Sequence, residues 1–223
     1  RSSSPATSSR NPKREWLRPP GKRMAAEARL RAERKSWRQD HPFNFVARPV
    51  AKPDGSQDLF EWDCKIPARE SSVWYPGIYP GRLSFTTEYP ERPPTFKFLP
   101  IDGKPLFHPN VFNDGKICMS IINPPESMHA YGQGGNWSVS VTIKQARGTG
   151  RFATPSAASG LTLPARPARA APQVLQAVQM FLDESTSRAA GREEAYNLYN
   201  NNRAEYNKRV KQQVARVEAV PGA

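Results

Sequence analysis

The chain contains few cysteines and no long apolar run. These two features argue against a disulfide-rich secreted protein and against a membrane-spanning helix. Two cysteines in 223 residues are too few for the disulfide framework of a small secreted protein. No stretch approaches the roughly 20 apolar residues that a membrane-spanning helix needs. A phosphate-cradling glycine loop and a metal-ligand motif are also missing. With no signal-peptide pattern present, these features predict a soluble protein of a reducing intracellular compartment.

Acidic residues are scarce as well: 33 Lys and Arg stand against 20 Asp and Glu, a formal net charge of +13. Such a charge would ordinarily suggest a nucleic acid or an acidic membrane as the partner. Residues 1–23, however, contain seven Lys or Arg and one acid, and residues 146–172 contain four Arg and no acid. Subtracting this +6 and +4 leaves only +3 for the rest of the chain. We therefore predict no direct nucleic-acid partner and no membrane partner.

Both basic segments have too few apolar residues to form a core. Residues 1–23 are rich in Ser, Pro and Arg and precede Met24, so we expect a disordered tail or upstream translated sequence. Residues 146–172 consist mainly of Ala, Arg, Pro, Gly, Ser and Thr, which predicts a looped-out insertion or retained intron sequence. The length suits a single domain over residues 24–218, interrupted by this insertion and followed by a tail at 219–223.

The remaining patterns predict an α+β fold: an N-terminal helix, a four-stranded antiparallel meander, and further helices. Helix formers with a thin apolar stripe occupy residues 25–40. Strand patterns follow at residues 43–48, 59–66, 79–86 and 95–99. With residues 146–172 removed, one apolar helix face runs through Ile143, Val174, Val178, Phe181 and Leu182. A single terminal helix is predicted over residues 193–217.

The two cysteines stand in different patterns. Cys64 lies on the apolar face of the alternating segment 59–66, which predicts that it is buried in the core. Cys118 follows the turn formers at 113–115 and lacks such alternation. A free cysteine is more often a small buried hydrophobe than a catalyst. The setting of Cys118 nevertheless favours a nucleophile near a surface groove.

Four motifs in a fixed order make the chain similar to the ubiquitin-like conjugating enzymes. They are Tyr-Pro-Glu-Arg-Pro-Pro at 89–94, His-Pro-Asn at 108–110, Gly-x-x-Cys at 115–118, and Trp137. The resemblance covers residues 29–122 and, without the insertion, residues 137 to the end. Within the family, the segments that resemble the SUMO-conjugating branch are 34–43, 53–55, 62–67 and 205–210. The resemblance implies the ubiquitin-conjugating (UBC) fold, with an active-site loop between the meander and the C-terminal helices.

The chemistry that the resemblance implies is acyl transfer. Cys118 would take the C-terminal glycine of the modifier from an activating enzyme as a thioester, which a substrate lysine then attacks. The amide of Asn110 would donate to the oxyanion, although a role confined to holding its loop stays open. His108 has no acid spaced to orient it, so we expect it to shape the loop. The activating enzyme uses the ATP, and this chain is expected to have no cofactor or metal of its own.

The resemblance assigns substrate contacts to Lys97, Phe112 and Asp114. Three departures bear on this assignment. Phe112 lacks the hydroxyl of the tyrosine usual in the SUMO branch, Lys116 replaces a small polar residue, and Ala189 stands where an aspartate often receives the incoming lysine. We therefore hypothesise that Asp114 supplies a replacement carboxylate.

Further expectations concern partners. Arg34, Lys35, Arg38 and His41 match positions that in the SUMO branch contact the activating enzyme and a second, non-covalently held SUMO. The expected partners are thus SUMO or ubiquitin, the activating enzyme, ligases and substrate proteins with acceptor lysines. The expected location is the nucleus and cytoplasm.

Three alternatives stay open at this point. Residues 123–136 are about nine residues longer than the SUMO branch needs and contain one acid, Glu126, which keeps ubiquitin transfer as an alternative. A non-catalytic scaffold that binds the modifier is a second alternative, and the presence of Cys118 counts against it. A redox-sensing protein is the third, disfavoured because no resolving cysteine is suitably placed.

Overall fold

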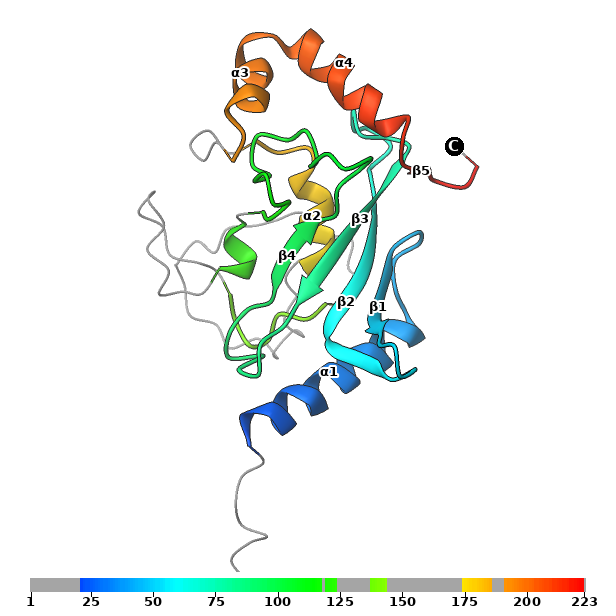
Figure 1. The fold of residues 1–223 in the computed structure, drawn as a ribbon, viewed down its shortest axis with the longest axis vertical. Coiled ribbons are helices and arrows are strands. Elements are labelled where there is room, and N and C mark those ends of the chain that lie inside the picture. Colours follow the sequence, from blue (N-terminus) through cyan, green and yellow to red (C-terminus); the bar gives the residue numbers. More distant parts are fainter. Residues whose placement is uncertain (1–20, 118, 124–136, 144–173, 186–190, 223) are drawn as a thin grey trace, which may run out of the picture.

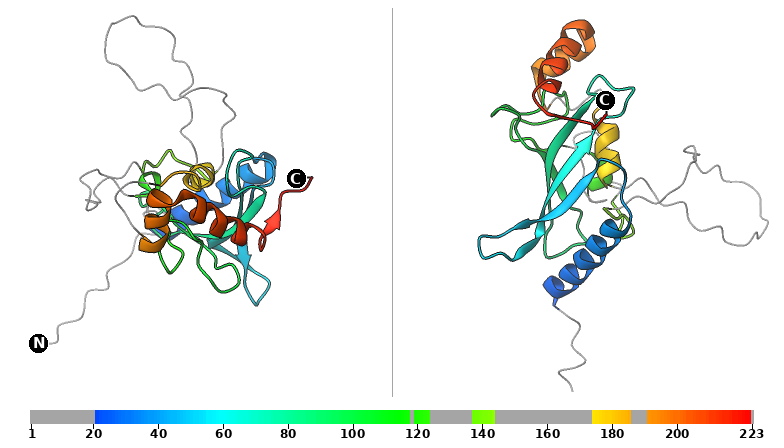
Figure 2. Two further views of the ribbon diagram at one scale, coloured as in Figure 1. Left: turned by 90° about the horizontal axis from the view of Figure 1, so that it is seen from above. Right: turned by 90° about the vertical axis from the view of Figure 1, so that its right-hand side faces the viewer.

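The computed structural model describes residues 21–117, 119–123, 137–143, 174–185 and 191–222. Four helices surround an antiparallel sheet (Figure 1): α1 (Lys22–Gln39), α2 (Val174–Phe181), α3 (Glu193–Asn201) and α4 (Arg203–Val214). Helix α2 lies along one face of the sheet, whereas α1 and the pair α3–α4 lie at opposite ends (Figure 2). This arrangement is the predicted α+β fold.

The sheet is the predicted meander with one addition. Its strands β1 (Val46–Ala51), β2 (Gln57–Pro67), β3 (Gly77–Ser84) and β4 (Thr95–Phe98) pair antiparallel in chain order. A further strand, β5 (Glu218–Ala219), pairs antiparallel with β3 at Gly77 and Ile78. Ala219, which the sequence places in a tail, therefore belongs to the sheet.

The core lies on the face of the sheet that α2 covers and extends to buried residues of α1 and α4. Alternate residues of β2 point into it, and Trp62, Cys64 and Ile66 are at most 2% exposed, which confirms the alternation predicted for this strand. Burial raises the pKa of the Cys64 thiol far above its usual value. Cys64 is thus a structural cysteine, as predicted.

Helix α1 starts at Lys22 rather than at residue 25, so Lys22 and Arg23 belong to the helix and not to the predicted disordered tail. It ends where the Asp40 N–H bonds the Ser36 carbonyl. Its buried residues are Ala26, Leu30, Glu33 and Trp37. One of these is a carboxylate, which the sequence pattern did not predict to be buried.

The prediction of a single terminal helix is wrong. Asn202 has non-helical dihedral angles of φ −146° and ψ 75° and separates α3 from α4. Its side-chain oxygen accepts a hydrogen bond from the Glu205 N–H at 3.1 Å, which caps the start of α4. A short polar side chain that bonds nearby backbone favours such a break over a continuous helix.

Two chain segments remote in sequence meet at the start of α2. The Val174 N–H donates to the Thr142 carbonyl at 3.5 Å, and Ile143 and Val174 are at most 1% exposed in the same core. The predicted apolar face is confirmed from Val174 to Leu182, whereas Ile143 lies in a bend ahead of the helix. The predicted insertion at 146–172 lies outside the described residues, as do residues 1–20.

Candidate active site

The loop before Cys118 is tied to itself and to β4. Cys118 lies outside the described residues, so the structure gives its neighbours on both sides. Val111 forms an antiparallel bridge with Ile117, and Lys97 of β4 forms one with Lys116. The Phe112 N–H donates to the Lys116 carbonyl at 2.9 Å. A closed turn over residues 112–116 thus leads directly to the cysteine.

Gly115 is the residue that this turn requires. Its φ of +83° lies in the left-handed region that disfavours side chains. A Cβ atom at this position would lie 2.1 Å from the carbonyl oxygen of Phe98. The Gly115 carbonyl also accepts a hydrogen bond from the Phe98 N–H at 2.9 Å. The turn can therefore dock on β4 only without a side chain at residue 115.

His108 is fully buried and shapes the loop, as predicted. Its ring lies 4.7 Å from that of Phe181, and its Nδ1 accepts a hydrogen bond from the Asn110 N–H at 3.1 Å. Burial lowers the pKa of His108 to about 3, against a smaller opposing effect of backbone hydrogen bonds with Phe181, Leu182 and Glu184. The imidazole is thus neutral near pH 7 and is used as a loop acceptor, which leaves it unsuited to be a solvent-facing base.

Asn110 is held within the same loop. It is 2% exposed, so its amide lies where water does not compete for hydrogen bonds. A donor in such a place stabilises charge more strongly than one in water. The Pro109 carbonyl beside it accepts from the Arg192 N–H at 3.1 Å, which fastens the loop to the start of α3. Asn110 is therefore shielded from water in a loop that is hydrogen-bonded to the residue before α3.

The predicted substrate residues Lys97, Phe112 and Asp114 lie around the turn. Asp114 accepts a hydrogen bond from the Lys116 N–H at 3.0 Å, and its second carboxylate oxygen lies 3.0 Å from the Lys116 ammonium. These contacts with Lys116 hold the pKa of Asp114 below its usual value. Phe112 is 42% exposed on the same turn. Asp114 is thus already paired, and Ala189 lies outside the described residues.

The predicted partner residues form a separate surface on and after α1. Lys35 and Arg38 are exposed, and Arg34 is half-buried. No ion pair between described residues involves any of these three. His41 follows the helix, and its ring stacks on Trp37 with centroids 5.4 Å apart. Helix α1 lies at the end of the sheet opposite α4 (Figure 1). Phe107 of the active-site loop, in contrast, packs against Tyr206 of α4.

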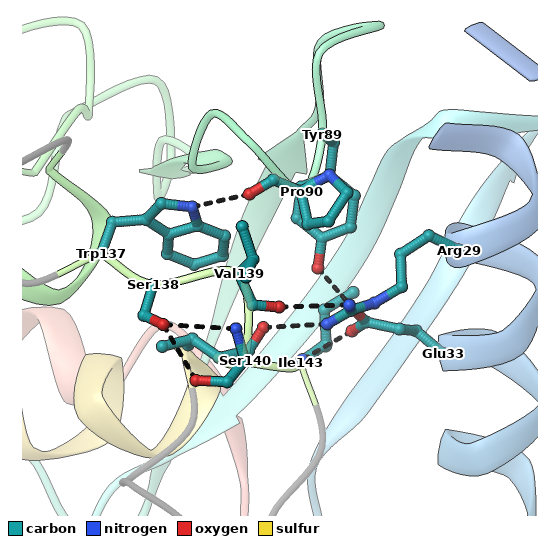
Figure 3. A network of polar contacts seen from close by, with 10 residues as sticks. Arg29, Glu33, Tyr89, Pro90, Trp137, Ser138, Val139, Ser140 and Ile143 are labelled. Atoms are coloured by element: carbon teal, nitrogen blue, oxygen red, sulfur yellow. Dashed lines mark hydrogen bonds and ion pairs between the residues drawn. The ribbon is translucent and has the colours of Figure 1, made fainter. Parts of the chain in front are cut away.

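The sequence patterns missed a buried polar network between α1 and residues 137–143. Its centre is the carboxylate of Glu33, which contacts Arg29, Tyr89 and Ile143 (Figure 3). A signal was available: Glu33 lies three residues after Leu30 and four before Trp37, on the apolar stripe of the helix. A carboxylate in that position faces the core.

Two further searches bear on the class of site. Within the described ranges, no three His, Cys, Asp or Glu side chains come together as metal ligands would. No helix in the described part of the chain is both long and apolar enough to span a bilayer.

Comparison with known proteins places the fold and its loop in a family. Residues 29–150 match the family model of the ubiquitin-conjugating enzymes. The chain is 35% identical over 194 residues to the SUMO-conjugating enzyme UBC9 of Caenorhabditis elegans, across 87% of this chain and 92% of that relative. It is 34% identical over 188 residues to the Sumo-conjugating enzyme ubc9 of Dictyostelium discoideum, across 84% and 92%.

The chain therefore belongs to the ubiquitin-conjugating enzyme family. It is a conjugating transferase, the class of enzyme that works through a thioester intermediate. Within that class its similarity is to the SUMO-conjugating enzymes, over most of their length and most of its own. The family resemblance and the UBC fold predicted from the motifs are both confirmed.

Proposed function

We propose that this chain is a SUMO-conjugating enzyme that carries SUMO as a thioester on Cys118 and transfers it to substrate lysines. The observation that carries the proposal is the similarity to two SUMO-conjugating enzymes over 87% and 84% of the chain. That similarity spans the loop whose last described residue before Cys118 is Ile117.

The proposed reaction has two acyl transfers. The Cys118 thiolate attacks the thioester carbonyl on the activating enzyme, and the activating enzyme's thiolate leaves. A substrate lysine with a neutral amine then attacks the new thioester, the nitrogen gives up a proton to solvent as the amide forms, and the Cys118 thiolate leaves. Both steps pass through an oxyanion, which the shielded amide of Asn110 would stabilise. His108 would stay neutral throughout and hold the loop.

Lysine capture is proposed to involve the turn at 112–116. The exposed ring of Phe112 offers a surface for the apolar stem of the incoming side chain. The carboxylate of Asp114 could receive its amine only by exchanging Lys116 for it, because Lys116 contacts both carboxylate oxygens. Lys97 lies across the bridge from Lys116 and would repel a cation but attract an acidic substrate residue.

The basic surface of Arg34, Lys35, Arg38 and His41 would meet the activating enzyme and a second SUMO. Its charges would act mainly on the rate of encounter and the choice of partner. We further propose that the chain has no cofactor of its own, that ATP is consumed by the activating enzyme, and that the reaction occurs in the nucleus and cytoplasm. That ligases are partners, and that the chain binds no nucleic acid directly, remain predictions from the sequence.

A charging assay tests the function. The protein is mixed with ATP, activating enzyme and either SUMO or ubiquitin, and adducts are resolved with and without reductant. The proposal predicts a reductant-sensitive adduct with SUMO that Cys118→Ala abolishes and Cys64→Ala retains. An adduct with ubiquitin alone would instead support the alternative that the long segment 123–136 keeps open. Folded protein that forms neither adduct would support a non-catalytic scaffold.

A further inference from the structure

The carboxylate of Glu33 is buried in the interior and is surrounded by hydrogen-bond donors. The residue is 5% exposed, and an ion at that depth is strongly disfavoured unless several partners compensate it. One oxygen accepts from Arg29 Nε at 2.6 Å and from the Tyr89 hydroxyl at 2.5 Å, and the other accepts from the Ile143 N–H at 2.7 Å. Both oxygens are therefore used, by partners from three separate parts of the chain.

Arg29 extends the same contact to residues 137–143, here called the strap. Its guanidinium donates to the carbonyls of Val139 and Val141, each at 3.2 Å. With the bond from Ile143 to Glu33, two side chains one helical turn apart hold the strap at three backbone points (Figure 3). We call Arg29, Glu33 and their contacts with the strap the Glu33 clamp.

The strap is in turn fastened to the segment that follows Cys118. The Trp137 N–H donates to the Asn123 carbonyl at 3.2 Å, and the Asn123 N–H donates to the Ser120 carbonyl at 3.2 Å. Ser120 opens the 3₁₀ turn η2 (Ser120–Ile122), two residues after the cysteine. Trp137 is itself anchored, because its indole N–H donates to the Pro90 carbonyl at 2.9 Å.

We propose that Glu33 and Arg29 are positioning residues for acyl transfer, acting through the strap on the downstream side of Cys118. The proposal rests on the proposed function. His108 and Gly115 fix the segment before the cysteine, whereas the Glu33 clamp fixes the segment after it. The distance from the thioester carbon to the Asn110 amide depends on both, and a misplacement of about 1 Å can slow a reaction by about 100-fold.

The test compares two glutamates of the same helix. Glu33→Gln keeps the size of the side chain and an acceptor oxygen but removes the charge that Arg29 needs. Glu27→Gln makes the same change at the more exposed Arg23–Glu27 pair. The rate measured is the single-turnover discharge of the preformed thioester to free lysine, under conditions where urea unfolding shows each variant to be fully folded. We expect about 10-fold to 100-fold slower discharge for Glu33→Gln and less than twofold change for Glu27→Gln.

A second variant and a second measurement keep the proposal falsifiable. If Glu33→Gln does not fold, Arg29→Lys keeps the charge but cannot reach both strap carbonyls, and the same slowing is expected. Amide hydrogen exchange is also expected to rise in residues 120–123 and to stay unchanged in residues 106–117.

The outcomes separate this inference from the proposed function. Wild-type protein that forms no thioester contradicts the proposed function, and the exchange measurement still decides on the clamp. A folded variant with normal discharge overturns the positioning role, and so does normal exchange in residues 120–123. A purely structural role would lower the urea midpoint and leave both the discharge rate and the exchange of these residues unchanged.

Discussion

The segments before and after Cys118 are held in place by different means. The segment before it, residues 106–117, is fixed largely by its own backbone bonds and by the neutral ring of His108. The strap after it is fixed by an ionised pair on a helix about 110 residues away in sequence. Upstream order thus combines local turn bonds with contacts to β4, α2 and the residue before α3, whereas downstream order depends on an ion pair of α1.

The two regions also differ in the charge of the polar side chain that each one buries. His108 is buried among Trp74 and Phe181, and this setting excludes the protonated form. Glu33 is buried among hydrogen-bond donors, which use both of its carboxylate oxygens. The upstream loop thus buries a neutral ring, whereas the clamp buries an ion pair whose polar partners compensate it.

The largest effect expected upstream is that of Asn110→Ala. Removal of one oxyanion donor typically slows acyl transfer by about 100-fold to 1,000-fold. Single-turnover discharge of the thioester to lysine measures it, with Asn113→Ala as the matched control because Asn113 is an exposed asparagine of the turn that follows Asn110. Normal discharge by folded Asn110→Ala would leave Asn110 with only its loop-holding role.

The next effect is the pH dependence of stability from His108. Its pKa of about 3 in the folded protein lies below the value near 6.5 of an unfolded chain, so the unfolded state binds the proton first. The contribution is complete above pH 6.5 and is lost as the pH falls toward 3, by up to about 1.4 kcal/mol per pH unit. Urea unfolding from pH 7 to 5 should show a steeper loss for wild type than for His108→Gln.

Exposed His41 provides the control for that measurement. His41→Gln makes the same substitution at an exposed imidazole instead of a buried one. Parallel profiles for wild type and His108→Gln would contradict the assignment of the slope to His108.

A modest gain in the free energy of unfolding is expected when residues 146–172 are excised. Thr142 and Val174 are already joined by a hydrogen bond, so the excision shortens the chain that this contact closes. About three halvings of that length, at about 0.6 kcal/mol each, should raise the free energy of unfolding by about 2 kcal/mol. Replacement of the segment by a Gly-Ser linker of equal length should give no gain. A loss of stability on excision would show that the segment supports the domain.

The smallest effects concern Asp114 and Lys116. Because Lys116 occupies the Asp114 carboxylate, Lys116→Ala should speed discharge to subsaturating lysine by about twofold. Asp114→Ala should slow it, and Lys104→Ala, a charge change at another exposed lysine, should do neither. Unchanged discharge by Asp114→Ala would rule out a role for this carboxylate in lysine capture.

Two features were predictable from sequence because their information is local. The alternation within β2 and the turn formers at 113–115 each span only a few residues, so the meander order and the turn were correctly predicted. The Asp114–Lys116 pair was not predicted, since residues two apart in a turn show no periodicity that reveals contact.

The downstream region was not predictable because its contacts join residues that are far apart in the sequence. Glu33 meets Tyr89 and Ile143 only after folding, and a charged helix normally keeps its carboxylates in solvent. The break at Asn202 was hidden because the apolar spacing continues across it. Strand β5 was hidden because two residues are too few for any alternation.

The close approach of Gly115 to the Phe98 carbonyl has a consequence for how this loop can vary. In a saturation library selected for conjugation, codon 115 should be depleted of every alternative to glycine, since even alanine would meet the β4 backbone. The neighbouring positions 113 and 114 are exposed and should accept many residues. Selection would thus leave glycine invariant at position 115, between the tolerant positions 113 and 114 and the cysteine. That pattern in the selected sequences would show that the turn docks on β4 without a structure determination.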